Sequence, residues 1–149
     1  MTAAEVHLLA AEYYLKERQD DKAKYYYEEA VYQSFGFYQY LRSISNNAES
    51  PEPEQVFDSS LKAYLDMEDV SWSAAAGMDE KLTLIAEQKW LHFNVVQSNE
   101  SWTEIRRLGK IDLDFWVDNT NQQSLPPARW MYVVQPEDKL TNTVFWDVN

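Results

Sequence analysis

The sequence predicts a mainly all-α protein of one domain, and three observations lead to this prediction. Apolar residues recur at helical spacing in several separate segments. Only three glycines occur in 149 residues, which argues against a fold built from many tight turns. With 45% apolar and 26% charged residues, the composition is that of a globular chain long enough to bury one core.

The first two predicted helices form a hairpin over residues 1–42. The first runs from Ala3 to near Arg18, because apolar residues recur at i, i+3, i+4 and i+7. These residues are Val6, Leu9, Ala10 and Tyr13. After a break at residues 19–21, helical spacing resumes in Ala23, Tyr26, Tyr27, Ala30, Val31 and Ser34. The short connection predicts antiparallel neighbours, which small residues allow to approach closely as in a tetratricopeptide-type pair: Ala10, Ala11, Ala23 and Ala30.

The middle of the chain predicts one further helix between two irregular segments. Residues 35–40 are a short aromatic-rich stretch, and residues 43–53 have the prolines and polar side chains of an exposed loop. Helical spacing then predicts a helix over residues 54–67. Its apolar residues are Val56, Leu61 and Leu65. A second break follows over residues 69–77, around Trp72.

A long helix over residues 78–96 is the clearest prediction. Asp79 and Glu80 suit its N-terminal end, where the helix dipole is positive. Apolar residues cover nearly its whole circumference, which is typical of a central, buried helix. One face holds Leu82, Ile85, Ala86, Trp90 and Phe93, and the other sides hold Leu84, Leu91 and Val95.

A shorter helix and an irregular tail complete the prediction. Ser101 and Glu104 have the spacing of a capping box, which predicts a short capped helix that begins there and continues through Leu108. Gly109 is placed to end it. In residues 110–149 several prolines exclude regular helix, and one alternating run predicts at most a short strand.

Charge and composition exclude several classes of function. The formal net charge of −12 would repel phosphate backbones, so nucleic acid is not an expected partner. The sequence contains no cysteine, which removes disulfides, thiolate metal sites and a cysteine nucleophile. Residues 1–16 are amphipathic, and no run reaches the roughly 18 apolar residues of a membrane span. We therefore expect no export signal in the chain as given, and a soluble protein.

Residues 84–109, LIAEQKWLHFNVVQSNESWTEIRRLG, contain the most specific pattern in the sequence. A helix with Q-K-W is followed closely by an E-x-W-x-x-x-R-R-x-G segment, which resembles the C-terminal hallmark of SusD/RagB-like proteins. Its elements are Gln88, Lys89, Trp90, Glu100, Trp102, Arg106, Arg107 and Gly109. The opening helix pair and the pieces PPARWMY and VFWDV resemble the same family, whereas the continuation after Tyr132 departs from its pattern.

The resemblance implies the C-terminal portion of a larger SusD-like fold. Within a single domain it would comprise a helix pair (1–42), a loop (43–53), a helical core (54–109) and a loop-rich tail (110–149). It also implies a lipoprotein on the surface of a Bacteroidetes-type outer membrane. Such a protein binds oligosaccharides without catalysis and delivers them to a SusC-like TonB-dependent transporter.

The residues themselves give no specific sign of catalysis. His7 and His92 are the only histidines, and neither has a second His or Cys at metal-ligand spacing, so no metal site is predicted. We expect His92 to be a hydrogen-bonded interior or boundary side chain. The sequence lacks a nucleophile elbow, a P-loop and a dinucleotide fingerprint, and carboxylate pairs among 25 acids are too unspecific to indicate a glycosidase. We predict a non-enzyme without cofactors.

Arg106 and Arg107 have two interpretations. They could bind a uronate or a sulfate through bidentate hydrogen bonds. We favour a structural role, because Arg106 lies one helical turn after Trp102 and can stack on its ring or pair with a buried acid such as Glu87.

Aromatic residues are in excess, with ten Tyr, six Trp and six Phe, and they supply candidates for sugar contact. Three tryptophans lie in predicted loops beside polar neighbours, as sugar-binding aromatic residues do, although ordinary packing explains them equally well. These candidates are Trp72, Trp116 and Trp130. Trp90 and Trp102 lie on apolar helix faces and are assigned to the core.

A helical protein-interaction module of tetratricopeptide type is the alternative function. One helix pair cannot bury both of its faces, so we expect an uncovered apolar face and self-association through residues 1–34. The residues expected near that face are Val6, Leu9, Tyr13, Tyr26 and Tyr27.

Overall fold

The computed structural model describes residues 1–45, 58–94 and 96–111. That part of the chain is helical and contains no strand, which confirms the predicted all-α class. Its elements are α1 (Ala3–Lys16), α2 (Asp20–Ser43), α3 (Asp58–Leu65), α4 (Met78–Phe93) and α5 (Ser98–Leu108). Within these described ranges, no helix has the length and apolar character that crossing a bilayer requires.

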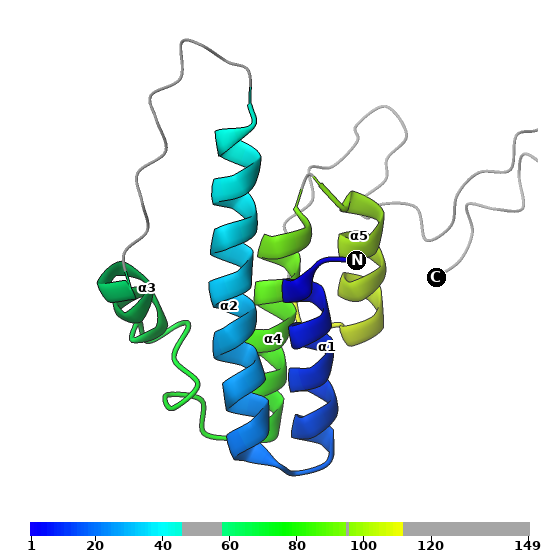
Figure 1. The fold of residues 1–149 in the computed structure, drawn as a ribbon. Helices are drawn as coiled ribbons and strands as arrows, with labels where there is room; N and C mark the ends of the chain where they lie inside the picture. Colours follow the sequence, from blue (N-terminus) through cyan, green and yellow to red (C-terminus); the bar gives the residue numbers. More distant parts are fainter. Residues whose placement is uncertain (46–57, 95, 112–149) are drawn as a thin grey trace, which may run out of the picture. The chain divides into compact units, whose positions relative to one another are not determined.

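Helices α1 and α2 form the predicted antiparallel hairpin and lie side by side (Figure 1). Their connection is short, and Arg18 adopts a positive φ of 58° within it. Of the four small residues expected to face the interior, Ala11, Ala23 and Ala30 are buried and Ala10 is partly buried. The hairpin is thus held by close contact between the two axes.

Helix α2 is longer than the sequence suggested, because residues 35–40 continue it to Ser43. The aromatic rings of this stretch pack against later elements. Phe35 meets Tyr64 of α3 with ring centroids 5.5 Å apart, and the Tyr38 hydroxyl donates to the carbonyl oxygen of His92 at 2.5 Å. These tertiary contacts favour the additional helical turns.

The apolar stripe predicted on α1 is its outward face. Val6, Leu9 and Tyr13 are exposed, as expected for an uncovered face, and Tyr26 is partly buried. Tyr27 is fully buried, so its assignment to that face was wrong. The buried face of α1 is instead formed by Ala4, Leu8, Ala11, Glu12 and Leu15.

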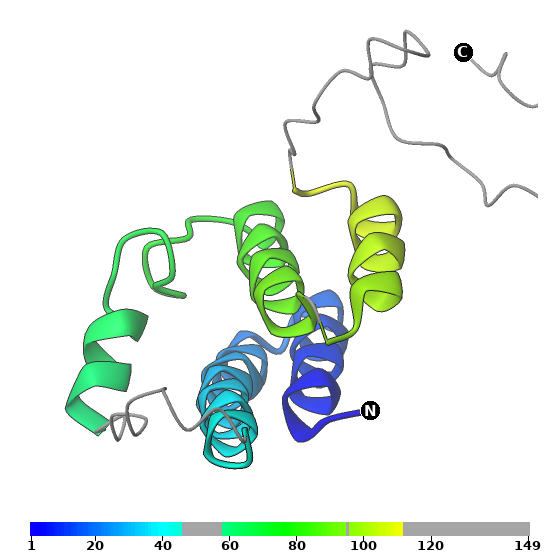
Figure 2. The same ribbon diagram turned by 90° about the horizontal axis from the view of Figure 1, so that it is seen from above.

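Helix α4 packs on both α1 and α2, and α5 packs on α4, as the view from above shows (Figure 2). Helix α4 ends at Phe93 and not at Val96, because Asn94 takes a positive φ of 24°. Contrary to the prediction it is not buried all round. Leu91 is exposed, and Trp90 is 40% exposed, so the assignment of Trp90 to the core was wrong.

Helix α5 begins at Ser98, three residues earlier than predicted, and Ser101 lies within it. The Ser101–Glu104 capping box is therefore wrong. A capping box does occur at the start of α1, where the Thr2 hydroxyl accepts from the Glu5 amide and the Glu5 carboxylate accepts from the Thr2 amide, both at 3.2 Å. Gly109 ends α5 in the left-handed conformation, φ 59°, as predicted.

The core lies between the hairpin, α3, α4 and the segment that precedes α4. Tyr27 is central to it, since its hydroxyl donates to the Val70 carbonyl oxygen at 2.8 Å and its ring centroid lies 5.2 Å from that of Trp72. Burial raises the pKa of Tyr27 and so keeps its hydroxyl protonated. Around it are Leu8, Leu15, Val31, Leu61, Leu84 and Ile85.

Candidate functional site

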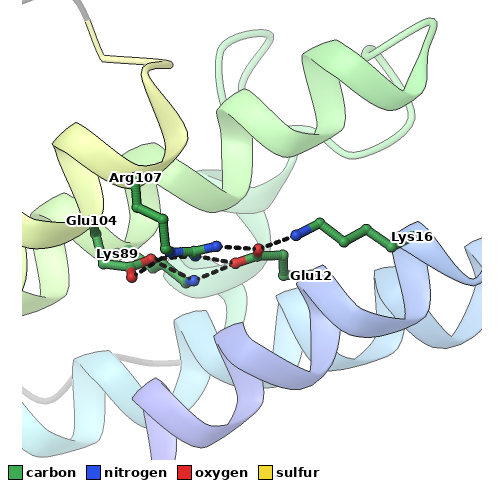
Figure 3. Close-up of polar contacts among 5 residues, drawn as sticks. All are labelled: Glu12, Lys16, Lys89, Glu104 and Arg107. Atoms are coloured by element: carbon green, nitrogen blue, oxygen red, sulfur yellow. Dashed lines mark hydrogen bonds and ion pairs between the residues drawn. The ribbon is translucent and has the colours of Figure 1, made fainter.

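A buried cluster of charged side chains joins α1, α4 and α5 (Figure 3). Lys89 of α4 is at its centre, with Nζ 2.6 Å from Glu12 Oε2 and 2.8 Å from Glu104 Oε2. Arg107 of α5 binds Glu12 with two hydrogen bonds, of 2.7 and 2.6 Å. We call these four residues, with Lys16 at their edge 2.6 Å from Glu12 Oε1, the ion-pair cluster.

The electrostatics of the cluster depend on complete pairing. Burial would raise the pKa of Glu12, but hydrogen bonds from Arg107, Lys16 and Lys89 more than offset this and hold that pKa well below its usual range. Hydrogen bonds from Arg107, and then from Lys89, likewise lower the pKa of Glu104. Because the Lys89 side chain is only 1% exposed, these two carboxylates compensate its buried ammonium group.

The cluster contains two residues of the most specific pattern in the sequence. Lys89 belongs to the Q-K-W element and Arg107 to the R-R element, and both reach Glu12 on the first helix. These contacts support a structural role for Arg107, whose partners are Glu12 and Glu104. Arg106 is exposed. Sequence reasoning did not identify Glu12 as a member of this cluster. The one sequence feature that could have done so is its helical spacing from Leu8 and Leu15, which lie on the same buried face of α1.

We expect the two arginines to respond differently to substitution. Arg107→Ala should lower the free energy of unfolding by about 1–2 kcal/mol, less than for a fully buried pair because the Arg107 side chain is 40% exposed. Arg106→Ala, with the same charge change, should alter it by less than about 0.5 kcal/mol. Urea unfolding of both variants measures the difference, and equal losses would contradict the assignment.

His92 is a second buried polar group that connects three elements. Its Nε2 lies 2.6 Å from the Thr2 hydroxyl at the start of α1, and its Nδ1 lies 2.8 Å from the Ser34 hydroxyl of α2. Burial lowers the pKa of His92, an effect that Glu5 partly opposes. The expected hydrogen-bonded interior histidine is confirmed.

The protein should lose stability in two stages as the pH falls. The pKa of His92 is below 6.5 in the folded state, so the unfolded state binds more protons and stability declines below about pH 6.5. The lowered pKa values of Glu12 and Glu104 add a second loss below about pH 4.5. Melting temperatures followed by circular dichroism should show both stages. His92→Gln should abolish the first stage alone, and an unchanged first stage would contradict the assignment to His92.

The structure removes one of the three tryptophans expected to contact sugar. Trp72 is 4% exposed, its ring packs at a tilt against Tyr27, and its indole N–H donates to Asp20 at 3.4 Å, so the expectation of an exposed ring is corrected. Trp116 and Trp130 lie outside the described residues. Trp102 is partly buried. Gln88, from the Q-K-W element, is buried and donates to the Tyr64 hydroxyl at 3.0 Å.

Tyrosines supply aromatic surface that the sequence analysis did not identify. His7, Tyr26 and Tyr14 stack across the α1–α2 seam with successive centroid distances of 5.7 and 5.2 Å. The Lys22 ammonium lies 5.1 Å from the Tyr14 ring centroid. Exposed rings of Tyr13 and Tyr25 flank this stack. His7 thus packs between the two helices. Within the described ranges, no group of three or more His, Asp or Glu side chains is arranged to hold a metal ion.

These features define an all-α protein in which ion pairs join α1 to α4 and α5, the two helices that carry the motif. A family model described as "SusD-like: Susd and RagB outer membrane lipoprotein" matches residues 1–142. The chain therefore belongs to the SusD-like family, as its signature residues indicated. No curated protein and no solved structure gives a significant match.

Proposed function

We propose that this protein takes part in non-catalytic capture of oligosaccharides at the cell surface and in their delivery to a SusC-like TonB-dependent transporter. The observation that carries the proposal is the ion-pair cluster, in which Lys89 and Arg107 of the family signature bind Glu12. It supports the view that this chain uses the signature as its SusD-like relatives would, to build the scaffold. Membership of an outer-membrane lipoprotein family supports capture at that membrane.

The surface of the described part fits capture of a sugar better than chemistry on one. Exposed tyrosine rings on α2 offer aromatic faces beside polar side chains, the combination that binds sugar rings. Trp116 and Trp130 remain proposed ligand contacts. The acidic net charge of −12 favours uncharged glycans over uronates and sulfated glycans.

Three measurements test this proposal. Purified protein on an array of plant and host glycans should retain oligosaccharides, and incubation with the same glycans should release no reducing ends. Purification from native outer membranes should recover a large TonB-dependent transporter with the protein. Release of reducing ends would refute the non-catalytic role, and binding without the transporter would refute delivery.

The exposed face of α1 favours a second candidate, a helical protein-interaction module that also self-associates. Val6, Leu9 and Tyr13 form an uncovered apolar stripe on that helix. If this stripe is an interface, light scattering coupled to size exclusion should show a dimer or larger species that Leu9→Glu dissociates. Tyr40→Glu, an exposed aromatic site on α2, is the control, and a monomer at all concentrations would refute self-association.

A further inference from the structure

An open hollow between α2 and α3 has the composition of a sugar-binding subsite. Its volume of about 380 Å³ lies within the usual range for small-ligand sites. The hollow is separate from the ion-pair cluster, and it contains none of the tryptophans proposed from the sequence. The residues that line it are Glu28, Tyr32, Leu61, Lys62, Leu65 and Asp66.

Tyr32 is the aromatic side of this hollow. It is 52% exposed, whereas Tyr27 on the same helix is fully buried, so the Tyr32 ring is not required to fill the core. Leu61 is buried and Leu65 partly buried, and they give the hollow an apolar lining. An aromatic ring beside an apolar surface is suited to the C–H face of a sugar ring.

The polar rim can bind the hydroxyl groups of the same sugar. Glu28 and Asp66 offer carboxylate acceptors, and Lys62 offers an ammonium donor. Lys62 pairs with Asp66 at 2.7 Å and Lys24 with Glu28 at 3.7 Å, but all four side chains are exposed. Such solvent-exposed pairs are weak, so their polar atoms can exchange partners for hydroxyls at little cost.

The charge of the lining and the spacing of nearby residues restrict the class of ligand further. The lining has two carboxylates against one ammonium, in a chain of net charge −12, which disfavours uronates and sulfated sugars. Tyr25 is also exposed, and it lies two helical turns before Tyr32 on the same face of α2, about 10 Å along the helix axis. Gly36, between Tyr32 and Tyr40, leaves open space beside the helix. A ligand longer than one sugar could therefore continue along α2.

We propose that the α2–α3 hollow is a subsite for a neutral oligosaccharide, with one sugar ring stacked on Tyr32. This inference rests on the proposed function and adds the location of a contact and its preference for uncharged sugars. It differs from the contacts proposed at Trp116 and Trp130, because all the residues that line the hollow belong to the described part of the chain.

Calorimetry with the 149-residue chain tests the subsite. The probes are neutral cello-, xylo-, manno- and malto-oligosaccharides and an oligogalacturonate of matched length. Tyr32→Ala should weaken binding of the preferred neutral ligand by about tenfold, and Tyr32→Phe should retain the affinity because it keeps the ring. Tyr13→Ala is the matched control, since Tyr13 is 58% exposed on α1 and does not line the hollow. Its affinity should equal that of the unmodified chain.

The possible outcomes separate this inference from the proposed function. With 3-fluorotyrosine incorporated, the fluorine signal assigned through Tyr32→Phe should shift on addition of the neutral ligand. Binding that Tyr32→Ala leaves unchanged, or stronger binding of oligogalacturonate, would overturn the subsite and leave glycan capture intact. A chain that binds none of the probes and shows no shift would overturn both.

Discussion

Replacement of Glu12 by Gln is expected to lower the free energy of unfolding by about 3–5 kcal/mol, the cost of leaving a buried charge without its partner. Lys89, 1% exposed, would keep only Glu104, and Arg107 would lose both of its bonds to a carboxylate on α1. The loss should be visible in urea denaturation at neutral pH. Glu17→Gln removes the same charge from an exposed position just after α1 and should change stability by less than about 0.5 kcal/mol.

A double variant separates pairing from packing at this site. Replacement of both buried partners, as in Glu12→Leu with Lys89→Met, should recover much of the stability that either single change removes. Apolar residues of similar volume can replace a buried ion pair at little cost. The coupling energy from this cycle should therefore be large. Additive losses would show that Glu12 and Lys89 act independently, contrary to their 2.6 Å contact.

Trp72→Ala is expected to lower the free energy of unfolding by about 3–5 kcal/mol, as removal of a large buried aromatic side chain does. The ring is 4% exposed, packs on Tyr27, and lies 5.2 Å from the Lys81 ammonium. Its loss would leave a cavity beside the core. Trp72→Phe, which retains part of the ring, should cost clearly less.

This result would distinguish the two interpretations of Trp72. A sugar contact predicts weaker glycan binding with an unchanged melting temperature. The buried position predicts a lower melting temperature, with glycan affinity preserved when binding is measured below the transition. Trp90→Ala is the contrast, because that ring is 40% exposed and should cost much less than Trp72→Ala.

Periodicity predicted the helices well and their ends less well. It located four of them and the hairpin, but it could not separate a buried face from an exposed apolar one. On α1 the stripe through Val6 and Leu9 is exposed, while the buried face includes the acid Glu12. The extension of α2 accompanies contacts of Phe35 and Tyr38 with later elements, which local spacing does not contain.

Local spacing was equally limited in predicting the helix caps and the ion-pair cluster. The spacing of a hydroxyl and an acid three residues later marks a real cap at Thr2 and a false one at Ser101, where Glu104 instead binds Lys89 and Arg107. The motif identified the family, yet its partner Glu12 lies 77 residues before Lys89. A loop prediction for Trp72 was correct about the backbone but gave no information on burial.

The long sequence separation within the ion-pair cluster has a consequence for the order of folding. Glu12 meets Lys89 across 77 residues and Arg107 across 95, whereas α1 and α2 are joined by a short turn. The hairpin can therefore form early, and the cluster closes only after the motif-bearing helices have been synthesised. Until then the hairpin lacks its packing against α4 and is only marginally stable, so the nascent hairpin should exchange its amide hydrogens rapidly. Protection of α1 should appear together with that of α4 and α5, in one late kinetic step.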